Sequence, residues 1–148
     1  MNQNLINIIN EVITEVDQSS EKLLISLKSE LAQAAQIVYN HWQQNEEGYC
    51  DSHGNGGICG DIADALAEVL FKHNIECTSV SSDHEVHVYV VAKLENEGIY
   101  LVDISPYTYE TGGGYCWKKI PDVEIDSYDI IINKISSDPE DFNNYVDY

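Results

Sequence analysis

Apolar residues recur at helical spacing along two stretches of the N-terminal third. The first stripe predicts an amphipathic helix and lies at Leu5, Ile8, Ile9, Val12, Ile13 and Val16. The polar run 17–20 interrupts the pattern, and Ser20 can cap the helix that follows. That second helix carries its stripe at Leu23, Leu24, Leu27, Leu31, Ala34, Ile37, Val38 and Trp42.

The pattern changes after Glu46. Residues 48–60 hold five glycines in thirteen positions, a density that predicts a loop. From Ile58 the helical spacing returns, and it ends near His73 and Asn74. Short runs of β-type residues separated by polar turns then predict three strands, over Ile75–Ser81, Val86–Lys93 and Ile99–Ile104.

The last two of these runs are apolar on both faces, which is typical of interior strands in a covered sheet. Residues 111–115 predict a glycine-rich loop, residues 123–135 a further strand, and the acidic tail from Ser136 is expected to be loosely ordered. Helices therefore precede strands, without the alternation of a βαβ chain. This order predicts an α+β fold with N-terminal helices and a third helix packed on an antiparallel sheet.

The length predicts a single domain over residues 1–148. Within it we distinguish a helical N-terminal segment (1–47), a core that carries the candidate chemistry (48–135) and an acidic tail (136–148). With 43% hydrophobic residues the chain can build a core, so wholesale disorder is not expected.

Charge narrows the possible partners. The 148 residues include 26 acidic side chains and seven lysines but no arginine, and the formal net charge is −19. A nucleic-acid binder needs a basic face, so nucleic acid is not expected as a partner. The lack of arginine also argues against a phosphorylated substrate. The acidity suits a neutral or basic partner.

The sequence shows neither a membrane span nor a signal peptide, which bears on the location of the protein and on the redox state of its cysteines. No run approaches the roughly 20 apolar residues that span a bilayer, and residues 1–16 lack the basic region of a signal peptide. We therefore expect a cytoplasmic protein with no membrane partner. Four cysteines in a chain of this length do not form a disulfide scaffold, so reduced thiols are expected.

Cys59 is the first candidate for chemistry. It follows the glycine run and opens a predicted helix, where unpaired backbone N–H groups and the helix dipole favour an anion. A thiol at such a position has a lowered pKa and a larger fraction of nucleophilic thiolate. The same N–H groups can form part of an oxyanion hole. The structural alternative is a small buried hydrophobic residue at a helix start.

A nucleophile needs a base, and two strand ends supply candidates. His87 opens one apolar strand and Asp103 ends the next. Both are costly to bury alone, but together they can satisfy each other. Asp103 would orient the imidazole, and His87 would take the proton of Cys59. The alternatives are a satisfied core histidine and a turn cap. His84 can also act as the base, although strand alternation puts it on the opposite face.

These residues resemble a known family in three places. The nucleophile helix resembles that of the transglutaminase-like group within the papain-like cysteine-enzyme superfamily, in the segment GGICGDIADALAEVLFKHNIECTSV. The family continues with a histidine followed two residues later by an aromatic residue, matched by His87 and Tyr89, and with a strand that ends in aspartate, matched by Asp103 before Pro106. The resemblance covers about residues 56–106.

The resemblance implies a papain-like core and acyl transfer through a thioester. Cys59 would attack a carboxamide or peptide carbonyl, and His87 would protonate the departing amine. Water would make the protein a peptidase, amidase or deamidase, and a lysine amine would make it a crosslinking enzyme. The expected partner is a protein or peptide substrate, basic or amine-bearing. No cofactor is expected, because a chain at −19 without arginine is a poor host for the CoA that arylamine N-acetyltransferases use.

Further residues can complete the site. His53 and Asn55, just upstream of the nucleophile, can supply an oxyanion donor or line the cleft, and Gln43 and Gln44 are more distant candidates for the donor. Aromatic residues after Asp103 can form a substrate rim or simply cover the sheet. These are Tyr107, Tyr109, Tyr115 and Trp117.

Two functions of other classes remain open. Cys50, His53, Cys59 and Cys116 can be read as four zinc ligands, but their spacing lacks the close pairs of known zinc folds, so no metal is expected. Alternatively, the chain is a non-catalytic acidic binding or inhibitor protein that imitates a polyanion. Contact between Cys59 and His87 in an open cleft would favour the enzyme.

Overall fold

The structure is a computed structural model that describes residues 21–44, 58–82, 87–106, 108 and 123–146. The helix predicted over residues 5–16, most of the glycine run 48–60 and the loop at 111–115 lie outside these ranges.

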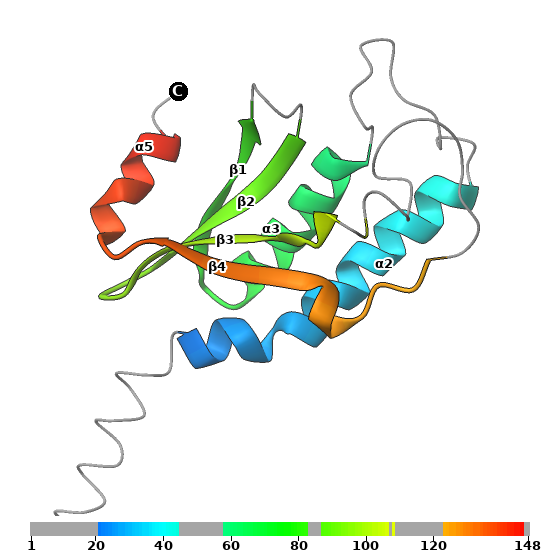
Figure 1. Ribbon diagram of the computed structural model, residues 1–148, viewed down its shortest axis with the longest axis horizontal. Helices are drawn as coiled ribbons and strands as arrows, with labels where there is room; N and C mark the ends of the chain where they lie inside the picture. The colour runs from blue at the N-terminus through cyan, green and yellow to red at the C-terminus, as the bar shows by residue number, and fades with distance from the viewer. Residues whose placement is uncertain (1–20, 45–57, 83–86, 107, 109–122, 147–148) are drawn as a thin grey trace, which may run out of the picture.

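Helices and strands follow the predicted order (Figure 1). The helices α2 (Lys28–Gln44) and α3 (Cys59–Lys72) come before a sheet of β1 (Glu76–Ser82), β2 (His87–Leu94), β3 (Gly98–Ile104) and β4 (Ile130–Ser136). Neighbouring strands are antiparallel and lie in the order β1-β2-β3-β4. The predicted α+β fold with an antiparallel sheet is confirmed. The two runs predicted as interior strands are the central ones, β2 and β3.

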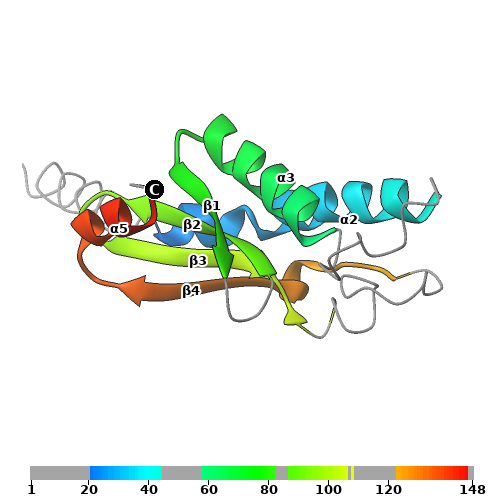
Figure 2. The ribbon, with the colours of Figure 1, turned by 90° about the horizontal axis from the view of Figure 1, so that it is seen from above.

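The main core lies between the helices and one face of the sheet. α3 contacts β1 and β2, and α2 packs against α3, so both helices run along the same side (Figure 2). Val90 and Ala92 of β2 face this core together with Leu66 and Leu70 of α3. Because successive strand residues point to opposite faces, this register also decides which β2 side chains lie on the other face.

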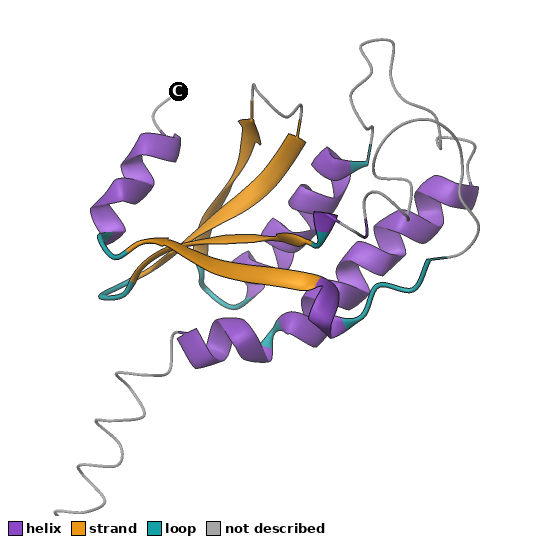
Figure 3. Ribbon diagram, viewed as in Figure 1, coloured by secondary structure: helices purple, strands orange, loops and turns teal. Residues whose placement is uncertain are grey.

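A smaller apolar cluster covers that other face. Val91 of β2 and Ile99 of β3 pack with Phe142, the last residue of the 3-10 helix η2 (Pro139–Phe142), and α5 (Asn143–Val146) follows (Figure 3). The expectation of a loosely ordered tail from Ser136 is wrong over these residues. Phe142 is only 3% exposed and fixes the segment to the sheet. A single aromatic residue in an acidic run makes no periodic pattern, so the docking of this segment could not be predicted from the sequence.

The helical stripe from Leu23 to Trp42 is divided at Leu27. Residues 21–26 are helical, Leu27 is a turn and α2 begins at Lys28. The Leu27 N–H is shared between the carbonyls of Leu23, at 3.1 Å, and Leu24, at 3.2 Å, a three-centre bond typical of helix ends. Leu27 itself stays buried, so the break leaves the apolar pattern unchanged. Within the described ranges no helix has the length and apolar character needed to cross a membrane.

The strand predicted over residues 123–135 is shorter than expected. Its first part has no regular secondary structure and leads into the 3-10 helix η1 (Ser127–Asp129), and β4 begins only at Ile130. Gln36 of α2 holds this first part, because its amide donates to the Val123 carbonyl at 2.8 Å and accepts from the Ile125 N–H. The Gln36 amide thus pairs with backbone groups of this segment as the backbone of a neighbouring strand would.

Two turns depend on unusual backbone angles. α3 ends at Lys72, and Asn74, in the turn that leads to β1, has a φ of 60°. Gly98, at the start of β3, has a φ of +133°. A Cβ at Gly98 would lie 2.0 Å from the carbonyl oxygen of Ser136, so both the backbone and the close approach of the chain after β4 require glycine here.

Candidate active site

Cys59 lies in the first turn of α3. The helix begins at this residue, and the N–H of Ile62 donates to the carbonyl of Ile58 at 2.9 Å. Ile58 and Leu66 are fully buried, which fixes the N-terminus of the helix against the core. Cys59 is therefore held where the helix dipole is positive and where N–H groups lack partners within the helix. Its side chain is largely covered, with 7% exposure for the residue.

β2 and β3 stop pairing close to His87 and Asp103. Their ladder begins at Val90 opposite Val102, whereas the β1–β2 ladder continues to Ser82 opposite His87. The β3–β4 ladder likewise continues through Asp103 to Ile104. The outer strands therefore hold both residues in place. At this end of the sheet, side chains rather than backbone groups connect β2 to β3.

His87 and Asp103 form that connection. The His87 Nε2 lies 2.6 Å from Asp103 Oδ2, and the two side chains are only 14% and 10% exposed. The other carboxylate oxygen, Oδ1, accepts the N–H of Ile104 at 2.8 Å. Both oxygens of Asp103 are thus engaged, which fixes the plane of the carboxylate and hence the direction from which it orients the imidazole.

The thiol of Cys59 completes the group. It is hydrogen-bonded to the His87 side chain and to the backbone of Val88 and Gly60. Burial by itself raises the pKa of the thiol. The hydrogen bond to His87, those to the two backbone groups and the positive charge of His87 lower it, and the net pKa lies below the ordinary value of 9.0. Asp103 occupies Nε2 of His87, so Nδ1 is the ring nitrogen that can face the sulfur.

His87 shifts in the complementary direction. Burial lowers the pKa of its imidazole, but hydrogen bonds to Asp103 and Cys59 and the charges of both groups raise it to about 9. A lowered thiol pKa and a raised imidazole pKa both favour a thiolate beside an imidazolium near neutral pH. Such a pair combines a nucleophile and a proton donor in one contact.

An aromatic ring also lies beside His87. Tyr89 is on the same face of β2, and its ring is stacked on the imidazole with centroids 6.3 Å apart and an interplanar angle of 26°. Tyr89 also packs against the Phe142 cluster. The imidazole is thus bordered by a carboxylate, a thiol and an aromatic ring.

Cys77 gives an internal contrast. Both described cysteines are buried free thiols, and Cys77 donates a weak hydrogen bond to the Ala67 carbonyl at 3.6 Å. Burial and the nearby charge of Glu76 raise the pKa of Cys77 to about 11. Burial alone therefore makes a thiol less acidic in this protein. The difference at Cys59 comes from His87 and the backbone donors.

The other predicted site residues are placed only in part. His53, Asn55, Tyr107 and Trp117 lie outside the described residues, as do His84, Tyr109, Tyr115, Cys50 and Cys116. Gln44 is exposed in the last turn of α2. In the described part of the chain, no group of three or more His, Cys, Asp or Glu side chains is arranged to hold a metal ion.

The sequence did not indicate the backbone contact from Val88. It depends on the end of the β2–β3 ladder, which no residue type marks, whereas the position of Gly60 in the first helical turn follows from that of Cys59. Comparisons with protein-family models, with curated proteins and with solved structures find no match to this chain. The arrangement of Cys59, His87 and Asp103 is therefore the observation that points to chemistry at this site.

Proposed function

We propose that the protein is a cysteine-dependent acyl-transfer enzyme that acts on amide or peptide bonds. One observation carries this proposal: the Cys59 thiol, the His87 imidazole and the Asp103 carboxylate form a continuous hydrogen-bonded series at the start of a helix. Burying the His87–Asp103 pair is costly unless its polar groups find hydrogen-bond partners, and here the further partner of His87 is the Cys59 thiol. The pKa of that thiol is lowered, and such shifted groups are common at active sites.

The chemistry follows from the protonation states. The Cys59 thiolate attacks the carbonyl carbon and forms a tetrahedral oxyanion, which N–H groups at the start of α3 can stabilise. The His87 imidazolium gives its proton to the leaving nitrogen, the C–N bond breaks, and an acyl-thioester remains. His87, now neutral, takes a proton from water or from a second amine, whose oxygen or nitrogen attacks the thioester. The acid or new amide departs, and the proton on His87 restores the imidazolium opposite the thiolate.

The family resemblance is part of the same proposal. A cysteine at the head of a helix, a histidine at the start of one strand and an aspartate near the end of the next match the order of the transglutaminase-like group. The antiparallel sheet with helices on one face is compatible with a papain-like core. Both features support the family assignment.

The proposed substrates are neutral or basic polypeptides. The net charge of −19 raises the local concentration of cationic or amine-bearing partners and opposes polyanions. The acceptor decides the class of enzyme. A glutamine-containing peptide incubated with and without a primary amine would release ammonia in both cases, but would gain the mass of the amine only if the protein crosslinks.

Thiol labelling tests the proposal directly. Iodoacetamide at near-neutral pH, followed by peptide mapping, is expected to modify Cys59 first, and Cys59→Ala is expected to abolish this fast labelling. Cys77→Ala and Cys116→Ala serve as matched controls and are expected to leave it intact. Equal labelling of all four cysteines would reject an activated nucleophile and favour the acidic binding protein.

A further inference from the structure

Gly60, the residue after the proposed nucleophile, is a glycine that neither its backbone nor the packing of the described residues requires. It lies inside α3, and its φ is not in the positive range that favours glycine. Apart from its chain neighbours and the nearby backbone of its own helix, no heavy atom of the described residues lies within 4 Å of the position where its Cβ would be. Gly98 is the contrast within the same chain, because there both a positive φ and a contact of 2.0 Å exclude any side chain.

Glycine at such a position weakens the helix. It has more conformational freedom to lose on folding than alanine and adds no packing, so alanine is the better residue wherever the space and the backbone allow it. At Gly60 the backbone and the packing of the described residues both allow alanine. Neither of them explains the glycine, whereas a function at the neighbouring thiol would.

The position of Gly60 indicates that function. Its backbone is hydrogen-bonded to the Cys59 thiol, so the residue borders the reactive sulfur. The His87 side chain and the Val88 backbone also contact the sulfur, and Ile58, which precedes Cys59, is fully buried. The described residues leave space at the Cβ position of Gly60, next to this thiol.

We infer that Gly60 is a specificity-determining residue, whose missing side chain keeps open the path by which a polypeptide substrate reaches Cys59. A small amide needs room only around its carbonyl group, whereas a polypeptide needs room for the chain on both sides of the scissile bond. A clear surface on the first turn of α3 therefore matters for the polypeptide. This inference rests on the proposed function of Cys59.

Two thiol reagents of different size test the inference. Iodoacetamide reports the reactivity of Cys59, and fluorescein-5-maleimide reports the space around it. In Gly60→Leu we expect the rate of maleimide labelling of Cys59 to fall roughly tenfold or more, while the iodoacetamide rate stays within about twofold of wild type. Glu68→Leu, at an exposed position farther along α3, is the matched control and should change neither rate.

Gly60→Ala keeps the test decisive if the leucine variant does not fold. It is expected to melt at or above the wild-type temperature and to slow the maleimide more than iodoacetamide. Unchanged maleimide rates in both variants, or an equal loss of both rates, would overturn the role of Gly60 while leaving the proposed function in place. A wild-type Cys59 that labels no faster than Cys77 would overturn the proposed function and this inference together.

Discussion

At the scale of single residues, the two described cysteines show how the surroundings of a thiol set its pKa. Both are buried, yet the pKa of Cys77 is raised to about 11 and that of Cys59 is lowered. Burial disfavours the thiolate at both positions. Only Cys59 has an imidazole and backbone donors beside it, so the reactive form depends on these partners.

The carboxylate of Asp103 acts on the thiol through His87. Asp103→Asn keeps the size of the side chain but removes the charge that helps raise the pKa of His87. We expect amide turnover to fall by roughly 10²- to 10⁴-fold. The thiolate fraction at neutral pH should fall as well, because His87 is less often protonated. Steady-state kinetics together with the absorbance of the thiolate near 240 nm check both effects. Unchanged turnover would contradict the assigned role.

The pH dependence of turnover follows from the two shifts. As pH falls through the lowered pKa of Cys59, the nucleophile becomes protonated and the rate drops. As pH rises through about 9, His87 loses the proton that the leaving amine needs, and the rate drops again. We therefore expect a bell-shaped profile of kcat/KM with its alkaline limb near pH 9. A profile that keeps rising above pH 10 would show that His87 is not the acid.

At the scale of elements, the position of the site depends on where pairing ends. The helix start at Cys59 and the strands that carry His87 and Asp103 could be predicted, because apolar periodicity and flanking turns mark them. The gap in the β2–β3 ladder before Val90 could not be predicted, since it depends on how the helix start and the sheet meet. That gap lets the His87 and Asp103 side chains meet.

The hairpin glycine offers a test at this scale. Gly98→Ala forces a side chain onto a φ of +133° and against the carbonyl oxygen of Ser136. We expect it to lower the free energy of unfolding by roughly 2 kcal/mol or more, measured by denaturant titration. Gly60→Ala is the matched control and is expected to cause no loss. Equal stability of the two variants would contradict the account of the turn.

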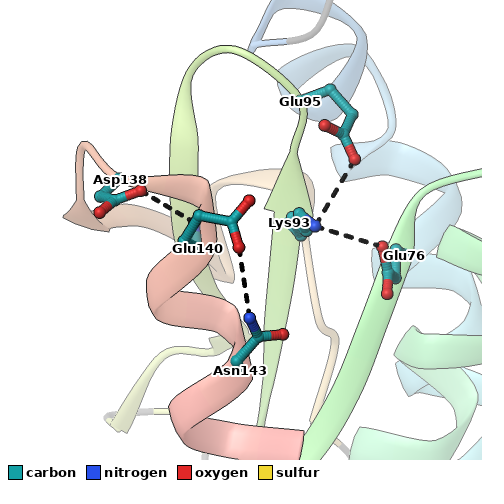
Figure 4. A network of polar contacts seen from close by, with 6 residues as sticks. All are labelled: Glu76, Lys93, Glu95, Asp138, Glu140 and Asn143. Atoms are coloured by element: carbon teal, nitrogen blue, oxygen red, sulfur yellow. Dashed lines mark hydrogen bonds and ion pairs between the residues drawn. The ribbon is translucent and has the colours of Figure 1, made fainter.

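At the scale of the whole molecule, the seven lysines are too few to form ion pairs with most of the 26 acidic side chains. Lys93 lies between Glu76, at 3.9 Å, and Glu95, at 3.7 Å, and the C-terminal segment relies on short-range bonds such as that from Asn143 to Glu140 at 3.3 Å (Figure 4). The carboxylates of these contacts are exposed, so the contacts add little stability. Apolar packing holds the acidic C-terminal segment in place.

Phe142 is therefore expected to contribute to the stability of the sheet as well as to the docking of its own segment. Phe142→Ala removes the central side chain of the cluster with Val91 and Ile99, and we expect a loss of about 3 kcal/mol in the free energy of unfolding. Val146→Ala, at a residue 48% exposed, is the control and should change stability by less than about 0.5 kcal/mol. Similar stability losses in the two variants would mean that the C-terminal segment is not anchored by Phe142.

The sequence predicted the order and type of the main helices and strands better than it predicted a break within a helix or the docking of the C-terminal segment. The predictions of the second and third helices and of the interior strands rest on patterns that span many residues, and α2, α3, β2 and β3 confirm them. The strand predicted over 123–135 is confirmed only from Ile130 onward. The turn at Leu27 interrupts the helix without interrupting its apolar stripe, and the docking of Phe142 depends on contacts with residues far away in the sequence. Such contacts leave no periodic pattern in the chain, and neither does the backbone contact between Val88 and Cys59.

The rate of Cys59 alkylation by iodoacetamide as a function of pH, in wild type and in His87→Ala, is the sharpest test of a thiolate–imidazolium pair. The wild-type rate is expected to reach its plateau below pH 9, because His87 and the backbone donors lower the pKa of the thiol. In His87→Ala burial dominates, and the rise is expected to move above pH 9. Superimposable profiles for the two proteins would contradict a thiolate–imidazolium pair at this site.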